Sequence, residues 1–195
     1  VAHPAERLAA QSVEDVDALL TEAVTAAGSI VADVAGVRVV GWGVGDNRPV
    51  ITYTTVVGAD IDISGANTVF ENIVFDMTGL DAITAGIDPT AAGIEFRNCK
   101  FLMADGDGQA AAAIITDVNC NRFKIIGCDV QAPDAGAVNF VRLVGAMNDV
   151  EIAWNRISGD FSDAAIETLA VGFASKTLQS QVVTSDSQQL VQRLH

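Results

Sequence analysis

The sequence is poor in the residues on which most hydrolases and nucleic-acid-binding proteins depend. Its only two histidines, His3 and His195, lie near opposite ends of the 195 residues, so a catalytic triad or a histidine-ligated zinc site would have to use a chain terminus. Lysine and arginine total 11 against 25 aspartates and glutamates, which gives a formal net charge of −14. Because such a chain offers few cations to phosphates or anionic lipids, neither nucleic acid nor a membrane is an expected partner.

Cysteines and long apolar runs are also scarce. Cys99, Cys120 and Cys128 are an odd number without the spacing of a zinc ribbon, and we predict that they are small buried side chains in a reducing compartment. No apolar run reaches the roughly 18 residues of a membrane span, and no signal segment is recognised at the start. Since 50% of the residues are hydrophobic, the composition indicates a folded domain with short arms rather than a disordered chain.

The first 29 residues are predicted to form a helical cap or arm. Ser12 and Asp15 are a plausible capping pair, and the next apolar residues recur at helical spacing as far as Ala27, before Gly28 ends the helix. This amphipathic helix has one apolar face, which we expect to cover another part of the molecule.

The pattern of residue types changes at residue 30. From there to about residue 170, short β-branched and aromatic runs alternate with glycine, asparagine, aspartate and threonine clusters, which is typical of an all-β domain. Residues 171–195 are polar and lack this pattern. We expect them to be a C-terminal arm or short helix that docks on a neighbour or caps the second end of the domain, with a disordered tail as the alternative.

A repeat of 26 to 29 residues runs through the β domain. Phe70–Phe75 and Phe96–Phe101 align with asparagine on asparagine, and the same slot falls next on Gly127 and then on Asn155. Asparagine and glycine tolerate left-handed backbone, so the slot predicts a sharp bend between two strands on successive turns. An acidic turn and an alanine-rich strand follow each bend. Three short strands in a period of this length favour a parallel β-helix over a propeller blade.

In a parallel β-helix, each turn pairs only with its neighbours and the apolar positions stack into interior ladders. The two open ends of the stack are sheet edges that must be covered. We expect the helix from Ser12 to Ala27 to cover the first end.

Four stretches carry a family resemblance: VAGVRVVGWGVGDNRP at 34–49, DIDI at 60–63, FRNCKF at 96–101 and ISGDFSDAAI at 157–166. Through them, the run from Val34 to about Ile166 resembles the right-handed parallel β-helix proteins (pectate-lyase-like fold) of tailed bacteriophages and prophages. Members of that group are generally virion components and usually trimeric. The resemblance implies the fold and a virion role, although the same fold also hosts polysaccharide lyases and hydrolases.

Acidic turns are the first candidates for catalysis. Asp76, Asp105, Asp134 and Asp160 follow the bends, and carboxylates on adjacent coils would stand roughly 5 Å apart, as in retaining glycosidases. A lyase-type site also needs a basic residue, for which the candidates are Arg97, Lys100, Arg122, Lys124 and Arg156. We prefer the interpretation that the acids form turns and the bases are solvated. The Gly-His-Gly element of the polygalacturonase type is missing from this sequence.

Aromatic side chains are candidates for carbohydrate stacking. They are Trp42, Tyr53 and Trp154, of which Trp154 precedes the expected bend at Asn155. A tryptophan there is either exposed or packed at a coil corner or a subunit contact, and we prefer the packed interpretation. The segment Gly41–Gly45 only superficially resembles a phosphate loop, because it lacks the Lys-Ser/Thr ending and a following helix.

The sequence therefore predicts an all-β, right-handed parallel β-helix of a few coils over residues 30–170. We predict a non-enzymatic virion protein, a capsid decoration or stabilisation protein that assembles as a homotrimer, contacts the major capsid or another virion protein, and is made in the host bacterial cytoplasm. No catalytic, cofactor-binding or metal-binding residue is assigned. The alternative is a tail fibre or spike that binds host surface polysaccharide and in one version cleaves it, and a secreted polysaccharide-modifying enzyme is a third option.

Overall fold

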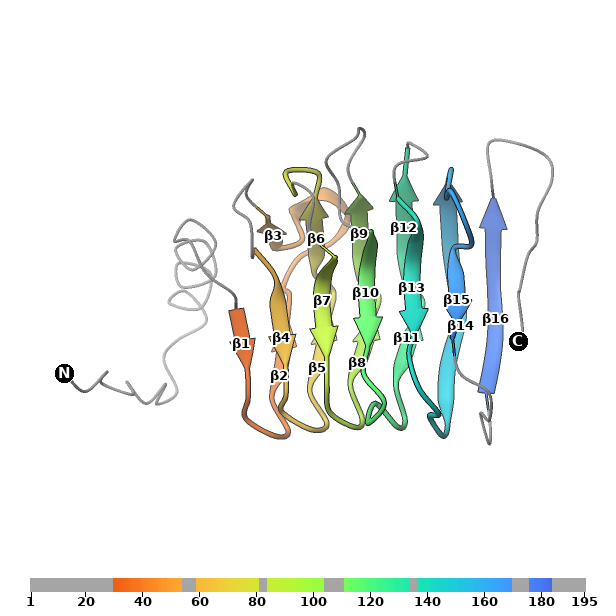
Figure 1. The fold of residues 1–195 in the computed structure, drawn as a ribbon. Coiled ribbons are helices and arrows are strands. Elements are labelled where there is room, and N and C mark those ends of the chain that lie inside the picture. The colour runs from red at the N-terminus through yellow and green to blue at the C-terminus, as the bar shows by residue number, and fades with distance from the viewer. Residues whose placement is uncertain are drawn as a thin grey trace.

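The computed structural model describes residues 30–53, 59–80, 84–103, 111–133, 137–169 and 176–183, the last of these by its backbone alone. Within these ranges every regular element except the short 3-10 helix η1 (Gly45–Asn47) is a β-strand. The strands stand side by side in chain order and form a parallel β-solenoid (Figure 1). The predicted fold class is confirmed.

Four successive coils contain three strands each. They are β1 (Ile30–Ala32), β2 (Arg38–Val40) and β3 (Val50–Thr52); β4 (Ile61–Ile63), β5 (Val69–Glu71) and β6 (Val74–Met77); β7 (Ala85–Pro89), β8 (Glu95–Arg97) and β9 (Lys100–Met103); and β10 (Ala112–Thr116), β11 (Lys124–Ile126) and β12 (Asp129–Ala132). The chain then continues with β13 (Asn139–Leu143), β14 (Val150–Gly159), β15 (Ile166–Thr168) and β16 (Lys176–Val183).

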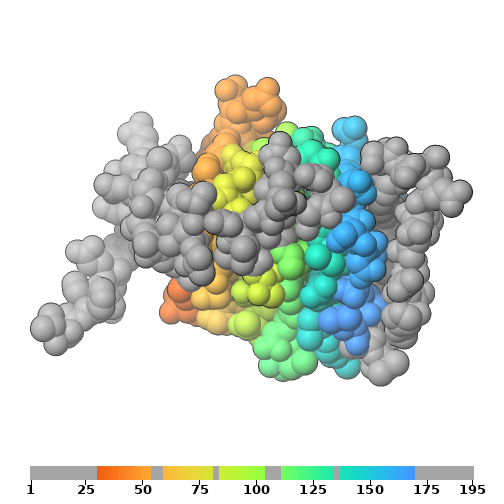
Figure 2. Space-filling view, turned by 45° about the horizontal axis from the view of Figure 1, so that its top comes forward, coloured from red at the N-terminus to blue at the C-terminus, as the bar shows by residue number. Residues whose placement is uncertain are grey.

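Strands at equivalent places in successive coils pair in parallel. Sheet A has the order β1-β4-β7-β10-β13-β15. Sheet B has two arms, β2-β5-β8-β11 and β3-β6-β9-β12, which the long strand β14 joins by pairing with both β11 and β12. Because the strands of each coil pair only with strands of the neighbouring coils, the colours follow one another across the space-filling view (Figure 2).

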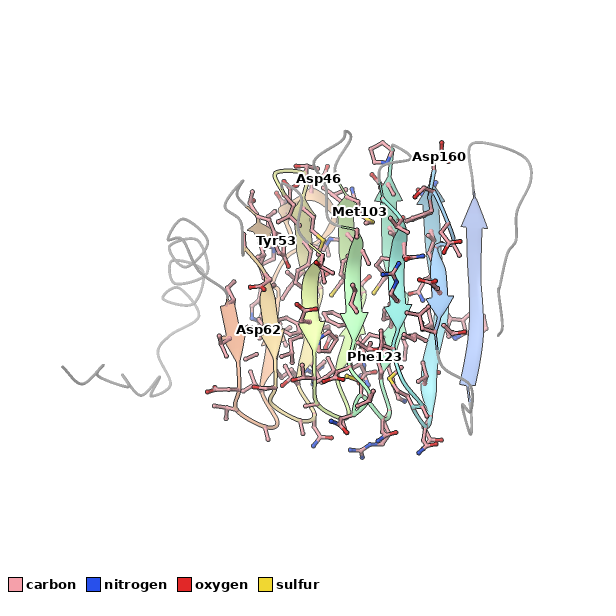
Figure 3. All side chains as sticks on the ribbon, in the orientation of Figure 1. Asp46, Tyr53, Asp62, Met103, Phe123 and Asp160 are labelled. Atoms are coloured by element: carbon pink, nitrogen blue, oxygen red, sulfur yellow. The ribbon has the colours of Figure 1, made fainter. Side chains whose placement is uncertain are left out.

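Phenylalanine rings fill the interior. Phe70 stacks on Phe96 with ring centroids 5.5 Å apart, and Phe75 stacks on Phe101 at 5.0 Å. Phe123, labelled in Figure 3, continues the core from β11's coil and is fully buried. These are the interior ladders that the repeat predicts. Burial of one such side chain stabilises the fold by about 1.5–3 kcal/mol, so the ladders hold the coils together.

The cysteines lie inside the same core, as predicted. Cys99, Cys120 and Cys128 are buried and free. The Cys120 thiol donates to the Pro89 carbonyl oxygen at 2.8 Å, and burial raises its pKa to about 11. At neutral pH this thiol is therefore protonated and acts as a small packing group.

The bend slot is occupied by residues with left-handed backbone. Asn72 has φ 59°, Asn98 has φ 49° and Gly127 has φ 66°. The asparagines also bond to one another, because Asn98 Nδ2 donates to Asn72 Oδ1 at 3.0 Å. The prediction of a repeated bend is confirmed at these three positions.

The sequence predicts Asn155 at the fourth position of the slot, and this prediction is wrong. Ile126 pairs with Ala153, so the slot falls on Trp154, whose φ is 60°. Asn155 points inward instead: its Oδ1 accepts from the Cys128 backbone N at 2.8 Å and its Nδ2 donates to the Ile125 carbonyl oxygen at 2.9 Å. The sequence is misleading here because a bulky aromatic residue is an unusual occupant of left-handed backbone.

Two segments lie outside the predicted β domain, and the structure describes part of the second one only. The helix predicted from Ser12 to Ala27 lies outside the described residues. In the segment 171–195, for which the sequence predicts an arm or tail without the strand pattern, residues Lys176–Val183 form β16, which pairs in parallel with β14. The sequence gives no signal for this strand. Strand pairing uses backbone groups, so a polar segment can extend a sheet without the usual apolar pattern.

Candidate metal centre

Three aspartates project outward from neighbouring strands at the N-terminal end of sheet A. In the DIDI stretch, Ile61 and Ile63 point into the core and are at most 1% exposed, so the alternation of a strand turns Asp60 and Asp62 to the opposite face. On β7 the buried Ile87 likewise precedes the outward Asp88. The register pairs Asp62 directly with Asp88.

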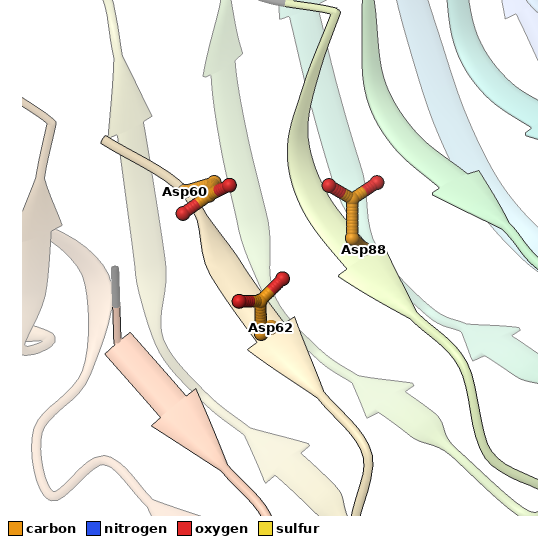
Figure 4. A group of neighbouring side chains, drawn as sticks. All are labelled: Asp60, Asp62 and Asp88. Atoms are coloured by element: carbon orange, nitrogen blue, oxygen red, sulfur yellow. The ribbon is translucent and has the colours of Figure 1, made fainter. Parts of the chain in front are cut away.

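The three carboxylates converge (Figure 4). One oxygen from each of Asp60, Asp62 and Asp88 lies within 4.8 Å of the others, and all three residues are half-buried. Calcium binds oxygen ligands at about 2.3–2.6 Å, so two ligands on opposite sides of one ion stand roughly 5 Å apart. The oxygens therefore lie within the span of a single calcium ion.

The cluster concentrates negative charge. Burial raises the pKa of Asp88 to about 6, and the charges of Asp60 and Asp62 act in the same direction. Burial and the charge of Asp60 also raise the pKa of Asp62. Within the described ranges, no ion pair involves any of the three carboxylates. Like charges that face each other across two strands destabilise a sheet, so the cluster is unfavourable without a counter-ion.

Tyr53 lies directly after β3, at the same end of the solenoid as Asp62 (Figure 3). The residue is only 4% exposed, and within the described ranges its buried hydroxyl has no hydrogen-bond partner. Its pKa is raised well above the usual value, first by burial and then by the charges of Asp60 and Asp88. Asp60 Oδ1 is likewise buried without a partner among the described residues.

The acids named from the sequence are placed elsewhere. Asp76 Oδ1 accepts from the backbone N of Thr78 at 3.1 Å and from its hydroxyl at 2.6 Å, so this carboxylate forms the turn, as the preferred interpretation holds. Asp160 is exposed after the end of β14. Asp105 and Asp134 lie outside the described residues.

Two of the candidate bases are engaged in ion pairs. Arg97 Nε lies 2.7 Å from Glu95 Oε1, and Lys124 Nζ lies 3.0 Å from Glu151 Oε2. Arg122 donates to Asn67 Oδ1 at 3.2 Å. These three residues are therefore not gathered around the acidic turn of Asp76.

The other two candidate bases share a neighbour. Lys100 and Arg156 stand on the strands either side of Asp129, since both pair with it in the register. Arg156 is exposed and Lys100 is half-buried. The structure brings these two bases to one acidic residue of β12, not to the candidate acids.

The aromatic candidates divide in the same way. Trp42 is 72% exposed and Trp154 is 69% exposed, whereas Tyr53 is buried. Trp154 therefore does not pack at a corner of its own chain, and that part of the preferred interpretation is wrong. Its side chain points away because the left-handed bend turns it out of the coil.

The sequence alone assigns no metal ligand, although a usable signal is present. The 26-residue step that aligns Asn72 with Asn98 also aligns Asp62 with Asp88. Once the bend slot is known, the DIDI stretch and Asp88 fall on adjacent strands, and the cluster follows. What the sequence does not contain is the inward placement of Tyr53.

A scan against protein-family models found no match, and neither the curated proteins nor the solved structures gave a significant match to this chain. In the part of the chain that the structure describes, no helix has the length and apolarity that a membrane span requires. Function is therefore inferred from the residues and their geometry.

Proposed function

We propose that the chain is a non-enzymatic structural module that decorates or stabilises the capsid of a tailed bacteriophage as a homotrimer. One observation carries the non-enzymatic part: several of the polar side chains that the sequence offered for catalysis have structural contacts. Asp76 forms a turn, and Arg97 and Lys124 are paired with glutamates. The virion role follows from the sequence resemblance.

The core supports a structural role. Stacked phenylalanines and parallel backbone pairing connect every coil to the next, which makes the solenoid a stiff body. A capsid decoration protein needs this property, because it must keep its shape under the strain of a packaged head.

The outer surface of the first coil supports self-association. Several of its large apolar side chains are more than one-third exposed: Val31, Val34, Val40, Trp42, Val44 and Val50. Exposed apolar surface marks protein contact sites where it forms a continuous patch. A trimer that buries them would remove this surface from water.

Two measurements test the proposal. Light scattering on the purified chain should give three times the 20.3 kDa chain mass, and a monomer would overturn the trimer. Phage particles made without this chain should lose their genome at a lower temperature than complete particles. Equal heat resistance of the two kinds of particle would overturn the stabilising role.

Trp154 favours a second candidate, a tail fibre or spike that binds polysaccharide. A bulky residue at φ 60° costs about 1–2 kcal/mol relative to a right-handed one, and such strain is often kept at functional sites. The exposed indole is suited to stacking on a sugar ring. Titration of host surface oligosaccharide should then quench tryptophan fluorescence in the wild type but not in Trp154→Ala, and an unchanged affinity would remove this candidate. In its cleaving version, depolymerase activity falls in Asp105→Asn or Asp134→Asn.

A further inference from the structure

We propose that Asp60, Asp62 and Asp88 bind one calcium ion, which joins β4 to β7 at the N-terminal end of the solenoid. The proposal does not depend on the virion role. It concerns a site to which the sequence alone assigns no function.

The ligand geometry is the first support. Two of the three carboxylates, Asp62 and Asp88, face each other on the hydrogen-bonded strands β4 and β7, and Asp60 lies one residue before β4, with its backbone carbonyl oxygen accepting from Ile30 N at 3.0 Å. An oxygen of each lies within 4.8 Å of the others. Ligands held by paired strands lose little conformational freedom on binding an ion.

Tyr53 is the second and independent support. The residue is only 4% exposed, and within the described part of the chain its buried hydroxyl has no hydrogen-bond partner. After burial, the charges that raise its pKa are those of Asp60 and Asp88, two of the three carboxylates. Buried polar groups without partners are rare in native proteins and mark bound ions or functional sites. The Tyr53 hydroxyl and Asp60 Oδ1 are two such groups in the first two coils of the solenoid.

The chemistry selects calcium among common cations. All the side-chain donors are oxygen, which excludes the sulfur and nitrogen ligands that zinc prefers. Magnesium demands near-ideal octahedral geometry with ligands at about 2.0–2.1 Å and usually keeps several of its waters. Calcium accepts longer and less regular distances and fills the remaining positions with water.

The ion would neutralise a repulsion that the protein leaves uncompensated. Asp62 and Asp88 face each other across the β4–β7 pair, and a divalent ion between them turns a like-charge contact into a cross-link. With three carboxylates and an exposed outer side, the expected affinity is that of extracellular calcium modules, with Kd about 10⁻⁴–10⁻³ M.

Calcium titration of the purified full chain tests the proposal. Isothermal titration with calcium chloride should give one site per chain, and calcium at about a hundredfold above Kd should raise the unfolding midpoint by roughly 5–10 °C relative to EDTA. Asp62→Asn and Asp88→Asn keep the side-chain shape and should each weaken binding at least tenfold. Asp160→Asn is the matched control, because it removes one exposed carboxylate outside the site and should bind as the wild type does.

Three results would overturn the proposal. They are the absence of any calcium effect on the wild type, an equal rise of the midpoint with the same concentration of magnesium, or an undiminished calcium response in both cluster variants. The asparagine variants relieve repulsion and are expected to fold in EDTA. Two of them are used, because the second still decides the question if the first fails to fold.

Discussion

Sheet A carries outward charged side chains near both of its ends. Opposite charges face each other near one end, and like charges face each other near the other. Near the C-terminal end, Arg142 on β13 faces Glu167 on β15, with 2.6 Å between Nε and Oε2, and Arg142 also donates to Asn139. Near the N-terminal end, Asp62 on β4 faces Asp88 on β7. One end is closed by opposite charges of the protein itself, whereas the other brings like charges together.

The difference is one of side chains, because both ends share the same parallel backbone pairing. The fold therefore does not require the acidic cluster, and a single substitution would remove the like-charge contact between Asp62 and Asp88. Retaining a like-charge contact is understandable if an ion completes it, which is the basis of the calcium proposal.

The largest loss of stability is expected in the hydrophobic interior, beneath the charged residues of both ends. Phe96→Ala removes a fully buried ring that stacks on Phe70 and should lower the free energy of unfolding by about 3–5 kcal/mol in urea titrations. Val118→Ala, at a side chain that is 49% exposed, is the control and should change stability little. A loss below about 1 kcal/mol for Phe96→Ala would mean that the ladder does not hold the coils together.

At the paired end, Glu167→Gln should lower the free energy of unfolding by about 1–2 kcal/mol, because it leaves Arg142 partly buried without its partner. Glu151→Gln makes the same change in the more exposed pair with Lys124 and should cost less than about 1 kcal/mol. Chemical denaturation of both variants at low salt measures the difference. Equal losses would show that burial does not distinguish the two pairs.

At the acidic end, removing a charge should stabilise the fold rather than destabilise it when no divalent ion is present. In EDTA at pH 7, Asp88→Asn should raise the free energy of unfolding by about 1 kcal/mol, a value reduced for solvent screening because Asp88 is only half-buried. The folded-state pKa of Asp88, about 6, lies above its unfolded value, so the folded protein binds this proton more tightly. Its contribution to stability is complete below about pH 4 and is lost as the pH rises through about 6.

Denaturation of the wild type and Asp88→Asn in EDTA at a series of pH values measures this dependence. The gain from the substitution should shrink toward zero as the pH falls to about 4. A gain that stays constant across the series would assign it to packing rather than to the charge of Asp88.

The smallest effect on stability is expected at the bend slot, where Trp154 is a residue type that disfavours left-handed backbone. Trp154→Asn places in the slot the residue type found at Asn72 and Asn98, and should raise the free energy of unfolding by up to about 1 kcal/mol. Trp42→Asn is the control, since Trp42 is equally exposed but is not among the positive-φ residues. If both substitutions change the unfolding midpoint alike, backbone strain at Trp154 is not the cause.

The sequence predicts the solenoid well because the repeated positions hold residue types with distinct backbone preferences. Asn72, Asn98 and Gly127 mark the bends, and the apolar residues three positions later mark the core. The prediction fails at Trp154 because a strained residue breaks the preference that defines the slot. The sequence does not indicate β16, because backbone pairing there does not require an apolar pattern.

The aspartate cluster is partly within reach of the sequence. The period places Asp62 beside Asp88, but a sequence alone does not distinguish an outward aspartate that coordinates an ion from one that shapes a turn, as Asp76 does. The structure adds the hydroxyl of Tyr53, buried and without a partner among the described residues, which favours the ion-binding interpretation.

The most direct test converts the acidic end into a copy of the paired end. Asp88→Arg places a positive charge opposite Asp62, in the arrangement that Arg142 and Glu167 already show. We predict that this variant unfolds in EDTA at or above the wild-type temperature and that calcium no longer raises its midpoint, while calcium still raises that of the wild type. A variant that unfolds below the wild type in EDTA, or that keeps the full calcium response, would contradict the calcium proposal.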